Sequence, residues 1–146
     1  MTGQMYIFNN TIFRSDDWLP TGALGGDRIG KHTMSRNNIL HVRPDDPYSI
    51  SNEKKSSVDN DFDYDLLSAK YPADQEKHGI KGVPRYVSDA GFTFETKTGN
   101  FQLAPDSPGL HQAVVIPNFC DVNDAPDIGA HESGAPPMVF GVKAEF

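Results

Sequence analysis

A pair of asparagines that recurs at a fixed distance constrains the fold of this chain more than any other feature. Asn9-Asn10 returns as Asn37-Asn38, 28 residues further on. This alignment places Tyr6 opposite Met34, Ile12 opposite Leu40, and Phe13 opposite His41. A period between 20 and 50 residues is typical of architectures built from stacked repeats.

A third, weaker copy follows in the segment DFDYDLL. Asp65 takes the place of Asn38 there, 27 residues later, and the next two positions are again apolar: Leu66 for Ile39 and Leu67 for Leu40. Each copy carries short apolar or β-branched runs broken by polar turn residues, a pattern that predicts strands and not a helix.

These repeats predict a solenoid of β coils. One coil cannot bury its inner face alone, but coils stacked at the strand spacing of about 4.8 Å share a core and pair their backbones. An Asn at the same corner of successive coils can bond the backbone of the neighbouring coil and tolerates a tight turn. Which positions face inward stays open, because Met34 and Leu40 favour even positions, which would also bury Arg36.

The totals limit the class of protein. The 146 residues suffice for one domain, and 23% charged and 37% apolar residues exclude a chain that is mainly membrane-spanning. A net charge of −7 disfavours nucleic acid as a partner, although a local basic patch could still bind acidic sugars. The single cysteine, Cys120, forms no internal disulfide, and residues 1–20 show no signal-peptide pattern.

Thirteen glycines and 11 prolines predict many turns and few helices. The segment that follows the first repeat reads as a loop that returns through a short strand near Ile29. A helical turn is expected at Ala73–Lys77. After Gly82 the chain shows a series of short strand-like runs: PRYV, FTFE, NFQL, AVVI and MVFGV.

The last third of the chain carries three motifs in a fixed order. They are Pro84-Arg85-Tyr86-Val87, then Gly99-Asn100-Phe101-Gln102-Leu103 with Ser107-Pro108-Gly109-Leu110, then Asp127-Ile128-Gly129-Ala130-His131-Glu132. This order resembles the C-terminal end of bacterial right-handed parallel β-helix proteins, a group that includes polysaccharide-lyase-like enzymes. Leu110-His111 stands where that group usually has Ile-Asp, which puts the hydrogen bonding of this corner in doubt.

The resemblance implies an all-β chain whose fold is a right-handed parallel β-helix. We expect coils with long loops at residues 1–79, a C-terminal segment at 80–134 that closes the stack, and a tail at 135–146. An alternative is that the C-terminal segment forms a small separate β domain. Missing N-terminal coils or a partner chain is expected to cover the first coil, since an exposed apolar edge favours aggregation. The implied location is secreted, periplasmic or at the cell surface.

The resemblance also implies a function on acidic polysaccharides, most plausibly cleavage of a uronate chain by β-elimination. That reaction needs a cation beside the uronate, a base for the C5 proton and an acid for the leaving oxygen. Hydrolases on the same fold use paired carboxylates instead. Lys31, His32 and Arg36 form the best local cluster for elimination, although ordinary solvated side chains would show the same pattern.

A second group of residues is suited to hold the sugar. Asp16, Asp17 and Trp18 combine carboxylates with an aromatic ring, as sugar subsites do, and Arg14 precedes them. The two carboxylates could also bind Ca²⁺, or the segment could be a plain polar loop. The alternating acids Asp59, Asp61, Asp63 and Asp65 resemble a calcium loop in composition only, since the glycine and glutamate of an EF-hand are missing, so repulsion or water contact is expected there. Two alternatives to an enzyme stay open: a carbohydrate-binding or adhesion solenoid, and an inactive structural fragment.

Overall fold

The computed structural model describes residues 3–14, 22–24, 32–43, 48–50, 59–87, 100–119 and 125–136. The predicted strands near Ile29, at residues 92–95 and at 138–142 lie outside these ranges, as does Cys120. In the described part, residues 113–116 form no strand, and Tyr86 and Leu103 make a single antiparallel bridge.

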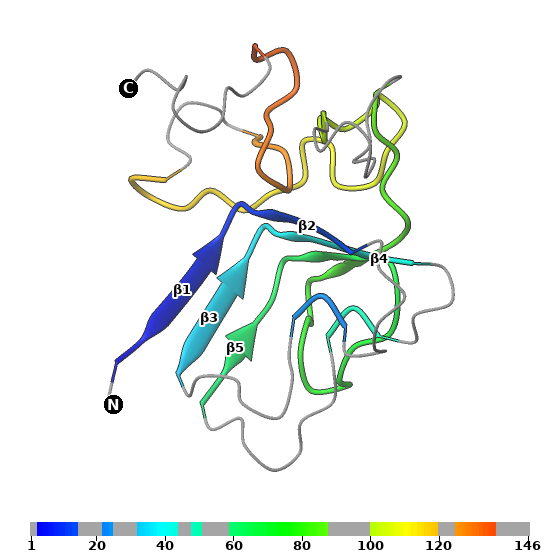
Figure 1. The fold of residues 1–146 in the computed structure, drawn as a ribbon. Coiled ribbons are helices and arrows are strands. Elements are labelled where there is room, and N and C mark those ends of the chain that lie inside the picture. The colour runs from blue at the N-terminus through cyan, green and yellow to red at the C-terminus, as the bar shows by residue number, and fades with distance from the viewer. Residues whose placement is uncertain are drawn as a thin grey trace, which may run out of the picture.

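The described residues form an all-β structure made of seven short strands in two parallel sheets. The strands are β1 (Met5–Phe8), β2 (Thr11–Arg14), β3 (Thr33–Arg36), β4 (Ile39–Val42), β5 (Asp61–Phe62), β6 (Leu66–Leu67) and β7 (Ile80–Lys81). One sheet has the order β1-β3-β5 and the other β2-β4-β6-β7, and every pairing in them is parallel. Figure 1 shows the chain turning a corner between the two sheets after each of the strands β1, β3 and β5.

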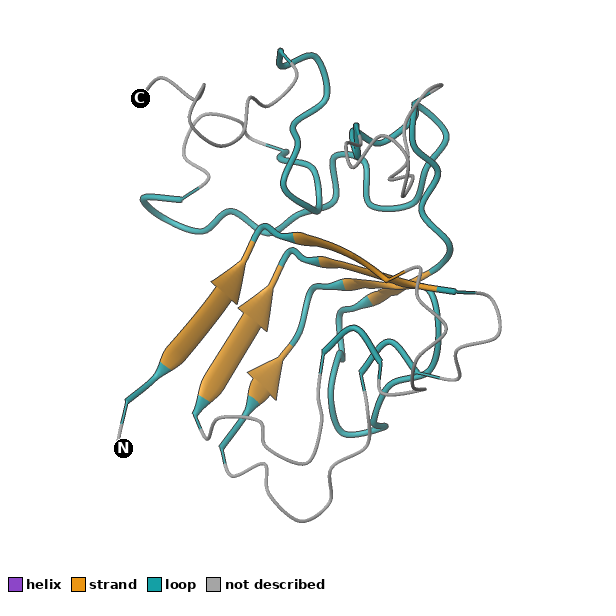
Figure 2. Cartoon of the chain, in the orientation of Figure 1, coloured by secondary structure: helices purple, strands orange, loops and turns teal. Residues whose placement is uncertain are grey.

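No helix occurs in the described ranges (Figure 2). The predicted helical turn at Ala73–Lys77 is therefore wrong. This segment is a turn in which the Gln75 N–H donates to the Pro72 carbonyl at 3.1 Å.

The register of the sheets confirms the alignment of the repeats. Its parallel pairs include the expected ones: Tyr6 with Met34, Ile12 with Leu40, Phe13 with His41, Leu66 with Ile39, and Leu67 with Leu40. We call each pass through the two sheets a layer, so β1 and β2 form the first layer, β3 and β4 the second, and β5 and β6 the third. Two single parallel bridges, Leu24 to Ile50 and Tyr48 to Lys70, add a third stack of segments beside the sheets.

The corner between the sheets has the same backbone conformation in each layer. Asn9, Asn37 and Tyr64 occupy it with φ angles of 53°, 57° and 62°. Asn adopts this left-handed region more readily than most residues, which explains its recurrence, whereas tyrosine is unusual there.

The residues that follow the corner form a ladder of hydrogen bonds through the layers. The side-chain oxygen of Asn38 accepts the backbone N–H of Asn10 at 2.9 Å, and that of Asp65 accepts the N–H of Asn38 at 2.7 Å. Asn38 and Asp65 have no exposed surface, so these bonds satisfy polar groups that water cannot reach. The expected role of the corner asparagines is confirmed.

Apolar side chains gather on both faces of the four-stranded sheet. Leu40, Ile50, Phe62 and Leu67 fill the space between the stacks. Ile39 and Leu66 point to the opposite face, where Leu103 and Ile128 of the C-terminal segment cover them. The inward phase changes at the corner, because β3 buries its odd positions whereas β4 buries Ile39, Leu40 and Val42.

The C-terminal segment lies along the outer face of the four-stranded sheet, above β2 and β4 in Figure 1. It reaches the corner of the second layer, where the Gly129 N–H donates to the Asn37 carbonyl at 2.8 Å. The Asn37 side chain exchanges two further hydrogen bonds with the backbone of Val114. Most of the described part of residues 80–134 thus covers a face of the sheet, and β7 at its start pairs with β6 at the end of the stack. The boundaries of the three predicted parts stay a prediction.

In the motif around Asp127, side-chain carboxylates accept backbone N–H groups of neighbouring residues. The buried Asp127 carboxylate accepts the backbone N–H groups of His111, at 2.7 Å, and of Ser133. The Glu132 carboxylate in turn accepts the Asp127 N–H at 3.1 Å. The departure at His111 leaves this corner bonded, since the ring nitrogen of His111 also lies 3.2 Å from Asp127.

Candidate functional site

The outer face of the β1-β3-β5 sheet holds most of the described candidate residues. Tyr6, Met34 and Asp61 occupy one row across the three strands. The Tyr6 residue is 57% exposed. Beside it lies an open hollow of about 140 Å³ whose walls come from all three strands and the turns before them: Gln4, Tyr6, His32, Thr33, Met34, Asp59 and Asp61.

Three carboxylates at alternate positions in and beside β5 each face a basic side chain. The sequence predicted repulsion or water contact for four alternating acids, whereas the structure buries Asp65 and gives each of the other three a partner from a neighbouring segment. The three pairs are His32 with Asp59 at 3.5 Å, Arg36 with Asp61 at 2.6 Å, and His78 with Asp63 at 2.7 Å.

Asp63 shows how this pairing changes the chemistry of a carboxyl group. Its partial burial acts to raise its pKa, but hydrogen bonds from the ring and backbone of His78 and from the Tyr64 N–H outweigh that effect. The pKa of Asp63 therefore lies below its ordinary value. The Tyr64 ring stacks on the His78 ring with centroids 4.7 Å apart.

Arg36 is held in place by several contacts within the protein. Its guanidinium donates to the Ser35 carbonyl at 2.7 Å and to the Asp61 carbonyl at 3.0 Å, in addition to the Asp61 carboxylate. It also lies 5.9 Å from the centre of the Tyr64 ring, and only 16% of its side chain is exposed. These contacts fasten β5 to β3, so a substrate carboxylate would have to compete with Asp61 for Arg36.

His32 lies at the start of β3, at the wall of the hollow, with 42% of its side chain exposed. Its φ of 61° is matched by 58° at Asp59 in the following layer, so these two residues form a second left-handed corner. The Asn60 side chain accepts the Thr33 N–H at 2.9 Å beside this corner. The corner geometry therefore places the His32 ring next to the Asp59 carboxylate.

The structure brings together only part of the predicted site. His32 and Arg36 share the outer face, four residues apart on an extended segment, which corresponds to about 13 Å. Arg14 ends β2 in the other sheet, where it donates to the Gly22 carbonyl at 2.9 Å. Lys31, Asp16, Asp17 and Trp18 lie outside the described residues, so their roles stay predictions.

Sequence reasoning missed the aromatic side chains of this face. Tyr6 and Phe8 lie with their ring centres 5.7 Å apart, and Phe119 packs edge-on against Phe8 at 5.6 Å. Phe119 is 66% exposed. The signal was present in the alternation of MYIF, because the parallel register places Tyr6 beside Met34 and Phe8 beside Arg36.

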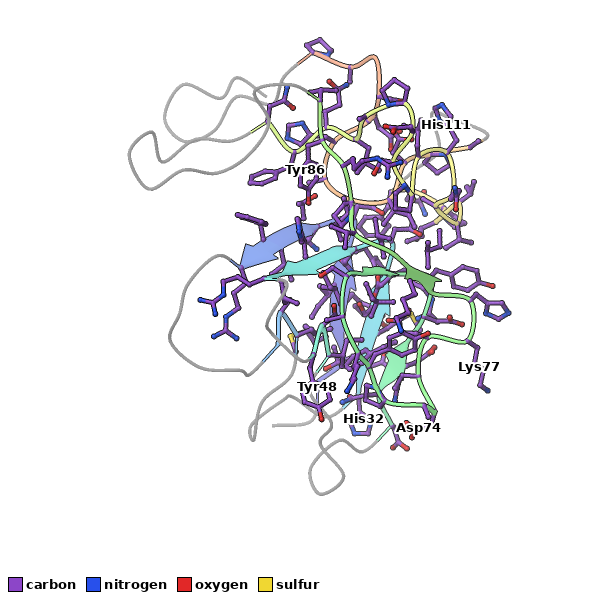
Figure 3. The ribbon with its side chains drawn as sticks, turned by 90° about the vertical axis from the view of Figure 1, so that its right-hand side faces the viewer. His32, Tyr48, Asp74, Lys77, Tyr86 and His111 are labelled. Atoms are coloured by element: carbon purple, nitrogen blue, oxygen red, sulfur yellow. The ribbon has the colours of Figure 1, made fainter. Side chains whose placement is uncertain are left out.

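A second cluster of aromatic residues joins the four-stranded sheet to the C-terminal segment. His41 Nδ1 lies 3.1 Å from the Tyr86 hydroxyl, and the rings of Phe13 and Phe101 pack against them. Burial lowers the pKa of His41 and raises that of Tyr86. Figure 3 shows Tyr86 at the opposite end of the molecule from His32, so the two surfaces are separate. We interpret this cluster as structural, because its rings pack the C-terminal segment against the four-stranded sheet.

Within the described ranges, no group of three or more His, Cys, Asp or Glu side chains is arranged to hold a metal ion. The possible Ca²⁺ ligands Asp16 and Asp17 lie outside those ranges, so calcium stays an untested prediction. No helix in the described part has the length and apolar character needed to cross a membrane.

Comparisons with protein-family models, with curated proteins and with solved structures gave no match. The resemblance to β-helix proteins therefore depends on the motifs of the sequence alone.

Proposed function

We propose that this chain forms part of a right-handed parallel β-helix and that its outer face, at β1, β3 and β5, binds a polysaccharide. The parallel pairing of layers 28 and 27 residues apart supports the fold, as does the third stack at Leu24, Ile50 and Lys70. The three C-terminal motifs support the same group of proteins. A secreted or cell-surface location follows from this proposal.

The exposed Tyr6 ring beside the hollow is the observation that carries the binding proposal. Sugar rings stack on aromatic faces, and their hydroxyl groups bond to carboxylates, amides and imidazoles placed around the ring. Asp59, Asp61, Gln4 and His32 supply such groups at the wall of the hollow. A parallel sheet repeats them along the stack, as a polymer of repeating units requires.

An acidic polysaccharide is the proposed ligand. Among the described residues of this face, His32 and Arg36 are basic groups that can bond a uronate, and each is balanced by an aspartate of the next layer. A uronate that bonds them would replace one carboxylate by another, so selectivity would come from the stacking on Tyr6 and the hydroxyl contacts.

Cleavage by β-elimination is the second candidate, favoured by the position of His32. Its ring is accessible at the hollow, and Asp59 lies 3.5 Å from Nδ1, where a carboxylate orients an imidazole. In this reaction His32 takes the C5 proton, the electron pair forms a C4–C5 double bond, and the C4–O bond breaks. The proton that His32 has taken then passes to the departing oxygen, directly or through water, while Arg36 stabilises the uronate.

Binding is tested by titrating the chain with oligomers of galacturonate, alginate and chondroitin, with maltohexaose as a neutral sugar, by calorimetry. Tyr6→Ala is expected to weaken binding about tenfold, the equivalent of about 1.4 kcal/mol, because the stacking surface is lost. Val83→Ala removes a similarly exposed apolar side chain elsewhere and should leave the affinity unchanged. Absence of binding to all four oligomers would contradict the proposal.

Cleavage is tested with the same acidic oligomers, by the ultraviolet absorbance of the unsaturated product. We expect His32→Ala to abolish the signal even at saturating oligomer, while measurable binding remains because the stacking surface of Tyr6 is kept. Retained cleavage in this variant would show that His32 is not the base. Binding without any absorbance change would support the binding proposal and contradict the lyase proposal.

A further inference from the structure

The two ends of the stack of layers differ in how their backbone groups are used. At the third layer, residues 71–81 occupy the edge. The Phe62 N–H donates to the Gln75 side chain at 3.0 Å, and the Phe62 carbonyl accepts the Glu76 N–H at 2.8 Å. β7 pairs with β6 in the other sheet, so both strands of the third layer have neighbours on this side.

At the opposite edge, β1 and β2 are the terminal strands of the two sheets among the residues that the structure describes. The N–H groups of Met5 and Asn9 donate toward the second layer, each at 3.1 Å. Adjacent peptide groups of a strand point to opposite sides, so the N–H groups of Tyr6 and Phe8 point away from it. Met5 is 42% exposed, whereas its partner in the second layer, Thr33, is 1% exposed. We call this side of β1 and β2 the open edge.

The corner ladder has a direction. Each side-chain oxygen accepts the backbone N–H of the layer before it, from Asn38 to Asn10 and from Asp65 to Asn38. Glu76 continues the series, because its Oε2 accepts the Asp65 N–H at 3.1 Å. Asn10 is the first member, so its side-chain oxygen occupies the acceptor position for an N–H from a layer ahead of the first.

We propose that the open edge binds a polypeptide segment that adds as one more parallel layer. The segment consists of a strand, a residue in the left-handed conformation and a second strand. Its strands pair with β1 and β2, which is the β-augmentation mode of recognition. The N–H of its residue after the corner donates to Asn10 Oδ1, which fixes the register in addition to the backbone pairing. The proposal does not depend on sugar binding.

A second copy of this chain does not meet these requirements. Its far edge is occupied by residues 71–81, so head-to-tail stacking would have to displace them. Two open edges related by a two-fold axis would pair antiparallel. The backbone N–H after the corner of one copy would then not lie opposite Asn10 of the other. The occupant is therefore a separate segment with the strand–corner–strand pattern.

The test uses the full chain and a peptide with the sequence of its own second layer, residues 32–43 (HTMSRNNILHVR). Backbone hydrogen exchange is measured by NMR with and without the peptide. We expect exchange at Tyr6 and Phe8 to slow at least tenfold at saturation, because their N–H groups gain acceptors. A second peptide carries Asn38→Pro, which removes the one N–H that reaches Asn10 while the protein stays unchanged.

The protein side of the contact is tested with two variants. Asn10→Asp keeps the acceptor, as Asp65 shows in the third layer, and is expected to retain peptide binding. Asn10→Leu removes it and should weaken binding at least tenfold. The proposal is overturned by unchanged exchange with the native peptide, or by equal protection from the proline peptide. Protection that grows with protein concentration alone would also overturn it, in favour of a second copy.

Discussion

At the scale of single residues, the polar ladder at the corner is the most informative feature of this molecule. Asn38, Asp65 and Glu76 are buried side chains that carry hydrogen bonds from layer to layer. The Ser35 hydroxyl also donates to Asp65. Such groups are tolerated inside a protein only when their hydrogen bonds are made, so each layer specifies the position of the next.

Replacement of Asn38 by alanine tests this ladder. The Asn38 amide accepts the Asn10 N–H and donates to the Ile7 carbonyl at 2.9 Å, and both would lose their partner. We expect a loss of roughly 2–3 kcal/mol in the free energy of unfolding, measured with urea. Asn10→Ala is the control, because Asn10 is exposed and water can replace its bonds, and it should cost less than about 1 kcal/mol. Equal losses would contradict the role of burial.

Glu76 predicts a pH dependence of stability. Burial, the charge of Asp65 and a hydrogen bond with Asp65 raise the pKa of Glu76 to about 9. In the unfolded chain this carboxyl group loses its proton near pH 4.5, whereas the folded chain keeps it. The folded state therefore binds more protons, and stability falls as the pH rises from about 4.5 to about 9.

The slope for one proton is at most about 1.4 kcal/mol per pH unit. Glu76→Gln keeps an oxygen for the Asp65 N–H and carries no charge, so its urea midpoint should fall less steeply between pH 5 and pH 8.5. Burial also raises the pKa of Asp65, so Asp65 contributes to the slope in the native protein and in the variant alike. A native protein with no slope in this window would contradict the expectation.

At the scale of elements, the strands of two to four residues are short, and their packing against the C-terminal segment compensates for this. The motif that contains Gly129 packs closely against these strands. Gly129 has a φ of 108°, and a Cβ there would lie 2.7 Å from Ile39 Cδ1 and 2.8 Å from Thr11 Oγ1. The motif that led to the family resemblance thus has a structural task, namely to hold its segment against β2 and β4.

Gly129→Ala is expected to destabilise the protein by roughly 2–4 kcal/mol, through both the backbone conformation and the overlap with Ile39. Gly134→Ala is a matched control. Its φ is 79°, but nothing lies within 4 Å of a Cβ there, so only the backbone cost of about 1 kcal/mol remains. Thermal unfolding of both variants measures the difference. Equal shifts would show that the close packing at Gly129 contributes nothing.

At the scale of the whole molecule, the stack is asymmetric. The second layer has neighbours on both sides, and Ile39 and Leu40 are fully buried, whereas the strands of the first layer are half-buried or exposed. In stacked repeats each layer is stabilised mainly by its neighbours, so stability is expected to differ between layers.

Native-state hydrogen exchange should show this order. The backbone N–H groups of Asn38 and Leu66 join the second and third layers by donating to Asp65 and to the Asn38 carbonyl, and we expect them to exchange at the slowest rates. The N–H groups of Met5, in β1, and of Asn9, directly after it, donate from the first layer to the second. They should exchange at least tenfold faster, because the first layer can open alone. Uniform protection would mean that the layers unfold as one unit.

The sequence alone determined the strands of the repeats, their parallel register and the role of the corner asparagines. These follow from local rules, because the spacing of Asn9-Asn10 and Asn37-Asn38 fixes which residues lie opposite each other. The phase of burial could not be read from the pattern, since a left-handed residue at the corner rotates the chain and changes which positions face inward. Only the tertiary structure decided that Asp59, Asp61 and Asp63 have basic partners and that Tyr6 lies beside a hollow. The same holds for Glu76 as the last member of the ladder. The contacts of His32 and Arg36 join adjacent layers whose side chains differ in charge, and those of His78 and Glu76 come from a turn outside the repeat. Such side chains meet only when the whole chain has folded.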